Sequence, residues 1–241
     1  MSTLPTILFE DEWLIAFDKP SGVLVAPDRW DSTLDNLMQL IRDRIAPTCF
    51  NVHGLDRDAS GIVLCAKTKE MKKTAGGLFE TGRALREFTA ITRGAPPSGD
   101  EGIINLPIGP DVRNPGRMRV SPDHGTPAET RYNVIERWTG FSLLRVISVT
   151  NRSHQARVHL AAIQTPIIGD QMYGDGIGLS LSEIKPHYKQ KGTPEKPLIS
   201  RLALHAGKTS LDHPVTGLPL VIEAPLPEKM EIAIKYLRRF A

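Results

Sequence analysis

The chain contains little cysteine and no long apolar segment. Cys49 and Cys65 are the only two cysteines, and each stands among apolar neighbours. Two thiols cannot form a disulfide framework or complete a zinc site alone, so we expect buried free thiols. No run approaches the roughly 18 apolar residues that a membrane helix needs, and no basic segment precedes an apolar one at the start, as in a secretory signal. These absences predict a cytoplasmic protein.

A large excess of charge of one sign is also absent. The 30 basic and 27 acidic residues give a net charge of +3, and hydrophobic residues make up 40% of the 241 positions. These values are ordinary for a globular protein and exclude the disordered and collagen-like classes. No repeat or linker-like boundary divides the sequence. We therefore predict one domain over residues 1–241, with a polar, lysine-bearing surface excursion at 176–197.

Apolar patterns predict both strands and helices. Helical spacing predicts one helix after Ser32, a second capped by Thr68 and ending near Gly82, and two more at 153–163 and 227–240. The glycine- and proline-rich stretch between residues 92 and 131 is expected to be a loop. Alternating or continuous apolar runs predict strands at 7–9, 13–17, 23–26, 62–66, 87–92, 131–136, 142–149, 201–211 and 218–224.

The segment HGLDRDASG, residues 53–61, is the first candidate for chemistry. Asp56 stands beside Arg57 in a turn that leads into an apolar strand. A neighbouring guanidinium favours the ionised form of a carboxylate, so Asp56 is a candidate catalytic group, with His53 and Arg57 as candidate substrate contacts. The alternative is that the aspartates and the serine only form the turn. Spacing alone does not decide between these interpretations.

The segment TNRSHQARVH, residues 150–159, is the second candidate. It leaves a strand and enters a helix, where backbone donors, Arg152 and Arg157 would suit an anionic group. The alternative is that both arginines are solvated residues at a helix end. His154 and His159 are five positions apart and do not have the i, i+4 spacing of a helical metal pair, so we expect no metal site.

Two clusters of basic residues complete the candidates. Arg113, Arg117 and Arg119 lie within seven residues with no acidic residue among them. Such a group suits contacts with phosphates, although a solvated loop is an equally good interpretation. Lys72 and Lys73 belong to a lysine cluster after Thr68.

The chain resembles the RluA-like family of RNA pseudouridine synthases from end to end. The segment around Asp56 is the most specific match. Many relatives carry an RNA-binding domain ahead of the catalytic domain, whereas the catalytic pattern begins here at about residue 7. We therefore expect the catalytic domain to recognise the substrate by itself. The matching segments, in order, are ILFEDEWLIAFDKPSGVLVAP, HGLDRDASGIVLCAKT, EFTAITRG, GTPAETRYNVIER, TNRSHQARVHLAAIQTPIIGDQMYG and RLALHAGKTSLDHPVTGLPLVIEAPLP.

The resemblance implies an α+β fold with a long mixed, mostly antiparallel sheet, flanked by helices and loops around a central RNA-binding cleft. It implies that a specific uridine in structured rRNA or tRNA is isomerised to pseudouridine without a cofactor. We expect a monomer that requires no metal and no protein partner. Asp56 would be the catalytic carboxylate, and Arg157 the basic partner that keeps it ionised. The implied supporting residues are Arg152 and His154, the pocket walls Ile168 and Leu204, and the RNA contacts Arg113, Arg117, Arg119, Lys72 and Lys73.

Two positions depart from the family pattern. Gly54 stands where relatives usually have an arginine that fills the space left by the flipped base. Phe88 stands where they usually have tyrosine, so the ring that stacks on uracil is kept and the hydroxyl is lost.

The departures leave a second hypothesis open, namely a non-catalytic RNA-binding protein that retains the synthase fold. A third, an unrelated carboxylate hydrolase, requires a second acidic group that faces Asp56. Asp58 is too close in sequence to fill that role.

Overall fold

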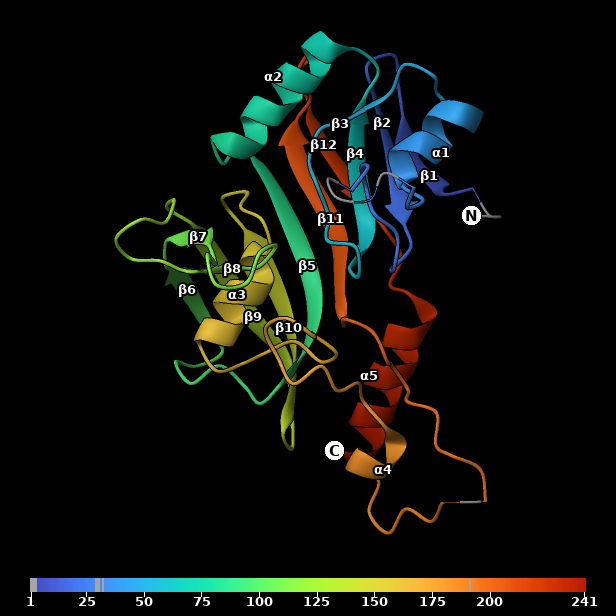
Figure 1. Cartoon of the computed structure of the whole chain (residues 1–241), viewed down its shortest axis with the longest axis vertical. Coiled ribbons are helices and arrows are strands. Elements are labelled where there is room, and N and C mark those ends of the chain that lie inside the picture. The colour runs from blue at the N-terminus through green and yellow to red at the C-terminus, as the bar shows by residue number, and fades with distance from the viewer. Residues whose placement is uncertain (1–3, 29–30, 32, 191) are drawn as a thin grey trace. The chain divides into compact units, whose positions relative to one another are not determined.

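The computed structural model describes residues 4–28, 31, 33–190 and 192–241. The chain divides into two compact units, whose elements are labelled in Figure 1. The first unit comprises Met1–Glu87, Val149–Ser153 and Ala206–Pro225, and the second comprises Phe88–Ser148, His154–His205 and Leu226–Ala241. The single domain predicted over residues 1–241 stays a prediction.

The first unit contains strands in the order β1-β2-β4-β11. Strands β1 (Thr6–Glu10) and β2 (Leu14–Lys19) form the predicted antiparallel hairpin, and β2 pairs with β4 (Ser60–Ala66). Every residue of β4 is buried, which confirms the predicted interior strand. The unit also contains β3 (Phe50–Asn51), which pairs with β4, and the predicted hairpin of β11 (Leu204–Asp212) with β12 (Pro219–Glu223).

Both faces of strand β2 are covered by protein. Leu14 and Ala16 belong to an apolar cluster with residues of helix α2 (Lys69–Glu80), whereas Ile15 and Phe17 belong to a cluster with residues of helix α1 (Leu37–Arg44). Successive side chains of a strand point to opposite faces of the sheet. A strand that is buried on both faces needs a continuous apolar run, and this explains the sequence patterns of β2 and β4.

The two helices of the first unit begin at side-chain caps. The Thr68 hydroxyl accepts the amide of Met71 at 3.1 Å, which confirms the predicted start of α2. Helix α1 begins later than expected, because the Asn36 side chain accepts the amide of Gln39 at 2.9 Å. The predicted cap, Ser32, lies outside the described residues.

The strand predicted at 23–26 is wrong. Its residues form only an isolated bridge, between Leu24 and Asn36. The carbonyl groups of Leu24 and Val25 accept the amides of Leu37 and Met38 at 2.8 and 2.9 Å. This segment therefore satisfies the first amides of helix α1 instead of pairing in the sheet.

The second unit contains most of β5 (Ala84–Arg93), followed in order by β10 (Phe141–Ser148), β9 (Glu129–Trp138) and β6 (Glu101–Asn105). Strands β7 (Ile108–Pro110) and β8 (Met118–Val120) form a separate two-stranded sheet. The strands predicted at 87–92, 131–136 and 142–149 are confirmed. The loop predicted between residues 92 and 131 is wrong, because β6, β7 and β8 lie in it and are too short to show a clear alternation.

Three helices belong to the second unit, namely α3 (Gln155–Ala162), α4 (Leu181–Ile184) and α5 (Glu228–Phe240). Helix α5 lies beside α4 (Figure 1) and buries the predicted apolar stripe, which includes Met230 and Leu237. The α+β class with mostly antiparallel strands is thus confirmed. Within the described part of the chain, no helix has the length and apolarity to cross a membrane.

Candidate active site

Asp56 lies on the loop between β3 and β4, and a buried ammonium group holds this loop. The Lys19 side chain is fully buried and donates to four backbone carbonyls, among them those of Arg57 at 3.0 Å and Ala59 at 2.7 Å. The amide of Gly22 also donates to the Arg57 carbonyl at 2.8 Å. The backbone that follows Asp56 in this loop is therefore fixed, while Asp56 itself is half-buried.

The predicted substrate contact His53 is a buried support of the same loop. Its Nδ1 lies 3.1 Å from the carbonyl oxygen of Gly54, and its Nε2 accepts the amide of Leu64 at 3.2 Å. Burial, together with the charge of Arg86, lowers the pKa of His53 to about 3. The neutral ring with its proton on Nδ1 satisfies both backbone partners.

Arg86 is a charged neighbour of Asp56 that sequence reasoning missed. It lies on β5 and is 7% exposed, with Nη1 donating to the Gly54 carbonyl at 2.8 Å and Nη2 to Asn151 Oδ1 at 2.6 Å. Burial lowers the pKa of Arg86 to about 10, whereas the charge of Asp56 acts to raise it. The two side chains therefore attract each other.

A sequence signal for Arg86 exists. The alternating strand β5 buries Ala84, Arg86, Phe88 and Ala90 in turn, so the arginine occupies an inward-facing position. The predicted strand began at residue 87 and omitted it. Arg57, the neighbour in sequence, is exposed, and its Nε donates to the Gly22 carbonyl at 3.2 Å.

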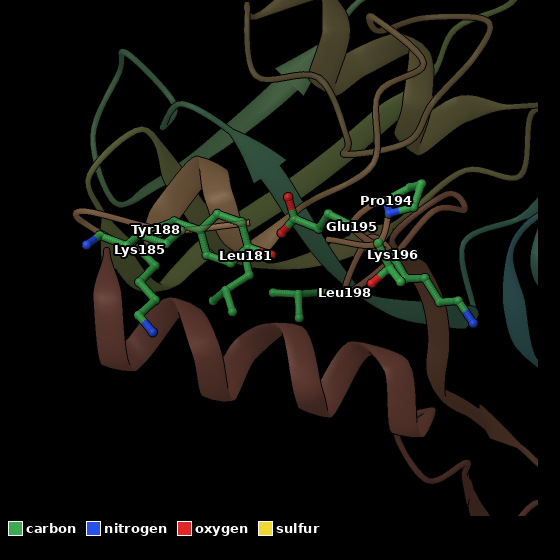
Figure 2. Close-up of a pocket in the computed structure, with 9 residues that line it drawn as sticks. Leu181, Lys185, Tyr188, Pro194, Glu195, Lys196 and Leu198 are labelled. Carbon is green, nitrogen blue, oxygen red and sulfur yellow. The ribbon is translucent and has the colours of Figure 1, made fainter. Parts of the chain in front are cut away.

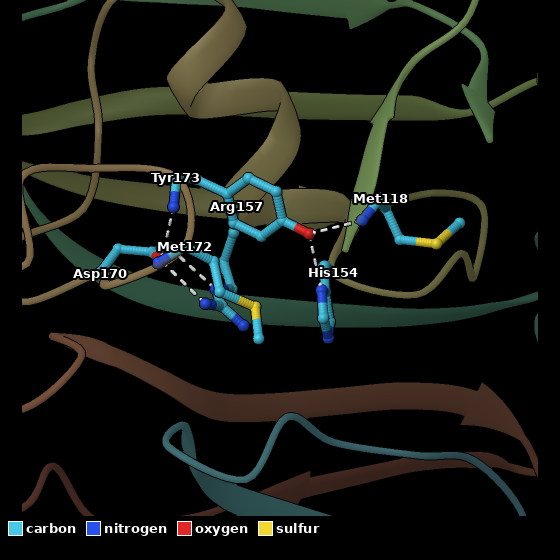
Figure 3. Close-up of polar contacts among 6 residues, drawn as sticks. All are labelled: Met118, His154, Arg157, Asp170, Met172 and Tyr173. Carbon is cyan, nitrogen blue, oxygen red and sulfur yellow. Dashed lines mark hydrogen bonds and ion pairs between the residues drawn. The ribbon is translucent and has the colours of Figure 1, made fainter. Parts of the chain in front are cut away.

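Arg157 lies on helix α3 of the second unit and forms a buried ion pair with Asp170 (Figure 3). Arg157 Nε donates to Asp170 Oδ2 at 2.8 Å and Nη2 to Oδ1 at 2.7 Å, while the side chains are 6% and 1% exposed. Asp170 also accepts the amides of Met172 and Tyr173 at 2.9 and 3.0 Å. Burial acts to raise the pKa of Asp170, but the hydrogen bonds and charge of Arg157 outweigh it and lower the pKa.

The backbone before Asp170 requires glycine. Gly169 has φ +72°, and a Cβ at this position would lie 2.4 Å from the carbonyl oxygen of Arg201. No side chain fits at that distance. The segment IIGD thus fixes the carboxylate that holds Arg157.

The predicted pair of Asp56 with Arg157 joins residues of the two units. Within its own unit, each residue has a partner of opposite charge that the sequence did not reveal. Asp56 is attracted by Arg86, and Arg157 is bound by Asp170. The pairing of Asp56 with Arg157 itself stays a prediction.

Tyr173 connects α3 to the arginine-rich loop, the segment 111–119, which comprises the connection from β7 to β8 and the first two residues of β8. Its hydroxyl oxygen accepts the amide of Met118 at 2.8 Å and lies 2.7 Å from His154 Nδ1 (Figure 3). The guanidinium carbons of Arg157 and Arg117 lie 5.0 and 5.5 Å from the centre of the Tyr173 ring. His154 has φ +55° and marks the sharp entry into α3.

The remaining predicted residues fall into two groups. Of the five predicted RNA contacts, Arg117 is half-buried and the other four are exposed, namely Arg113, Arg119, Lys72 and Lys73, so all five stay predictions. Arg152, the predicted supporting residue, is half-buried, and its role also stays a prediction. The three apolar candidates are buried: Phe88 is 4% exposed, Ile168 0% and Leu204 2%. Their part in a uracil pocket stays a prediction.

Gly54 has room for a larger side chain. A Cβ built at this position meets no heavy atom within 4 Å, and the residue is exposed. Crowding around the Cβ therefore does not explain why this chain has glycine where its relatives usually have arginine.

The second unit also contains a pocket of about 880 Å³ within the predicted excursion at 176–197 (Figure 2). Leu181 and Leu198 face helix α5 there, and none of the predicted site residues lines the pocket. Among the residues that the structure describes, no group of three histidine, cysteine or acidic residues is placed to hold a metal ion.

Comparison with known proteins identifies the family. The model described as RNA pseudouridylate synthase matches residues 13–162, which is more than half of the chain. The chain belongs to this family. The predicted activity class, RNA pseudouridine synthase and thus an isomerase, is thereby confirmed. Both functional segments, around Asp56 and around Arg157, lie within the matched residues.

Curated relatives of this RNA pseudouridylate synthase match over most of its length. The dual-specificity RNA pseudouridine synthase RluA of Salmonella typhi is 34% identical over 91% of the chain and 92% of the relative. The ribosomal large subunit pseudouridine synthase D of Pseudomonas aeruginosa is 35% identical over 97% of the chain and 72% of the relative. These names favour the enzyme over the non-catalytic alternative.

One solved structure supports the fold. Human RNA Pseudouridylate Synthase Domain Containing 4 superposes with a TM-score of 0.72 at 22% identity, covering 96% of this chain and 92% of the human one.

Proposed function

We propose that Asp56 is the carboxylate through which this synthase converts a specific uridine of structured rRNA or tRNA to pseudouridine. The observation that carries the proposal is the placement of Asp56 on a loop anchored by the Lys19 ammonium and attracted by the buried Arg86. The backbone beside this carboxylate is held in one position, and a buried guanidinium of opposite charge attracts the carboxylate.

The reaction explains why an ionised carboxylate is useful. The bond from C1′ of ribose to N1 of uracil breaks, the base turns, and a bond from C1′ to C5 forms. C5 releases its proton and N1 gains one, so the composition of the nucleotide is unchanged. Positive character develops on the sugar as the first bond breaks. Asp56 serves as the nucleophile at C1′ or as the base toward the 2′ hydrogen, and in either role its negative charge stabilises the transition state.

The decisive test compares Asp56→Asn with Asp58→Asn, the same substitution at an exposed aspartate of the same loop. Tritium release is measured from rRNA and tRNA transcripts labelled at C5 of uridine. Asp56→Asn should lower the rate by a factor on the order of 10³ or more with RNA binding retained. Asp58→Asn should keep nearly the wild-type rate. Turnover by Asp56→Asn at the wild-type rate would show that another group is catalytic.

The predicted pair of Asp56 with Arg157 has its own test. A double-mutant cycle of Asp56→Asn and Arg157→Gln measures their coupling in the residual rate. Additive effects would mean that the guanidinium does not act through this carboxylate.

The basic residues form the proposed RNA contacts. Arg113, Arg117 and Arg119 lie along the arginine-rich loop, where the first and last are exposed and Arg117 is half-buried, and guanidinium groups at a surface suit phosphates. Replacing all three by glutamine should weaken RNA binding and flatten its dependence on salt, because fewer counterions are released. Unchanged affinity and salt dependence would exclude the loop from the interface.

The enzyme is proposed to act on an RNA stem-loop as a cytoplasmic monomer that requires no protein partner. Mapping pseudouridine in total RNA from cells with and without the gene would name the substrate site.

A further inference from the structure

We propose that Tyr173 is a positioning residue, which holds the arginine-rich loop against helix α3 so that the loop is ordered before RNA arrives. The inference rests on the proposed function, in which this loop contacts RNA phosphates. It concerns the second unit alone, because Tyr173, α3 and the loop all belong to it.

The Tyr173 hydroxyl lies where three parts of the unit meet. It accepts the amide of Met118, which is the first residue of β8 and directly follows Arg117. It also lies 2.7 Å from Nδ1 of His154, the residue before α3 (Figure 3). Tyr173 itself follows Asp170, the partner of Arg157, by three residues and donates its amide to that carboxylate at 3.0 Å.

The ring of Tyr173 adds an apolar and electrostatic contact to this hydroxyl. It packs with Met118 and Val120 against the small cluster of Ile108, Ala128 and Val158. The Arg117 guanidinium carbon lies 5.5 Å from the ring centre, within the range of a cation–π contact. The ring and the hydroxyl thus both engage the loop at its C-terminal end.

Within the arginine-rich loop, local bonds maintain a turn, and the Tyr173 contact fixes where the turn stands. The Asp111 carboxylate accepts the amide of Arg113 at 3.0 Å, and the Asp111 amide donates to the Arg117 carbonyl at 2.9 Å. These bonds shape the turn but do not tie it to α3. The bond from Met118 to Tyr173 does so, and it places Arg117 over the same ring as Arg157.

If the loop is already ordered, RNA binding does not include the entropic cost of ordering it. Tyr173→Phe keeps the ring and removes the hydroxyl, so it frees the Met118 amide while the cation–π contacts persist. The loss of one neutral hydrogen bond corresponds to about a fivefold weaker RNA affinity. The change should appear in KM and not in kcat, because loop order affects binding and not the chemical step.

The experiment measures tritium release and RNA binding for the wild type, Tyr173→Phe, the triple variant of Arg113, Arg117 and Arg119 to glutamine, and their combination. Uridine-labelled rRNA and tRNA transcripts are the probes. Tyr236→Phe removes one hydroxyl from α5 and is the matched control. Hydrogen exchange of the Met118 amide reports loop order without RNA. The exchange should become faster in the variants that carry Tyr173→Phe and should not change in Tyr236→Phe.

The expected result is a KM raised about fivefold by Tyr173→Phe in the wild-type background, and no further effect of this substitution in the triple variant. A normal KM in Tyr173→Phe, together with weakened binding by the triple variant, would overturn the role of Tyr173 and leave the RNA contact intact. A fall in kcat at constant KM would overturn it too, since the tyrosine would then act through Arg157. Normal binding by the triple variant would refute both the loop contact and this inference.

Discussion

The buried pair of Arg157 and Asp170 allows a sharp prediction of stability. Asp170→Asn preserves the shape of the side chain but removes its charge, and it breaks the buried ion pair that Asp170 forms with the Arg157 guanidinium. Removing one partner of a buried ion pair costs about 3–5 kcal/mol. For a chain of this size, each 1 kcal/mol shifts the Tm by roughly 2–4 °C, so we expect a fall of roughly 6–20 °C.

Thermal unfolding followed by circular dichroism measures the shift, and Asp175→Asn is its control. Asp175 also pairs with an arginine, Arg93, at 2.7 Å, but its side chain is 38% exposed. An exposed pair contributes about 0–1 kcal/mol, so the control should lower the Tm by only a few degrees. A second variant adds Arg157→Met to Asp170→Asn and should recover part of the loss, because both charges of the buried pair are then replaced by neutral groups.

The pH dependence of stability tests the contribution of Asp170 independently. The pKa of Asp170 is lowered in the folded protein, so its stabilising contribution is present above the unfolded value of about 3.9 and is lost as the pH falls through the folded value. The stability difference between the wild type and Asp170→Asn should therefore narrow in strong acid. A fall in Tm no larger for Asp170→Asn than for Asp175→Asn would contradict the role of the buried pair. A failure of the added Arg157→Met to raise the Tm of Asp170→Asn would contradict it too.

Three further predictions concern the first unit. Gly61→Ala should destabilise the protein by about 2–4 kcal/mol in urea unfolding, because Gly61 has φ +111° and the new Cβ would lie 2.3 Å from the Ala206 carbonyl oxygen; a wild-type midpoint would contradict this. Thr68→Ala should cost about 1 kcal/mol through the lost cap on the Met71 amide, seen as a Tm lower by a few degrees, and Thr68→Ser should restore it. Burial lowers the pKa of His53 to about 3 in the folded protein, whereas the unfolded chain takes up this proton below about pH 6.5. The free energy of unfolding should therefore fall by up to roughly 1.4 kcal/mol per pH unit as the pH drops from about 6.5 toward 3. Urea midpoints across this range should show that slope, and His53→Gln should lose most of it.

The elements that the sequence predicts well carry their own local signals. Strand β4 has an uninterrupted apolar run because both its faces are buried, and α2 has a cap, Thr68, whose hydroxyl reaches the first free amides. Helix α5 shows its buried stripe at helical spacing. In each case the residues that decide the structure are neighbours in the sequence.

The parts that the sequence does not reveal depend on distant partners. Segment 23–26 has the composition of a strand, but its carbonyl groups are taken by the first amides of α1. Asp56 stands beside Arg57 in the sequence, whereas the buried guanidinium that it attracts is Arg86, thirty residues further on. Asp170 lies in one of the segments through which the chain resembles its family, but only the fold shows that it binds Arg157.

Through the buried ammonium of Lys19, the N-terminal turn supports the loop that carries Asp56, more than thirty residues away in the sequence. Arginine is a poor substitute, because a planar guanidinium needs more room than a fully enclosed ammonium and directs its donors differently. Deleting the first two strands would leave Asp56 in the chain but would remove the cation around which its loop is wrapped. Engineered truncations, fusions or circular permutations should therefore spare this end of the protein.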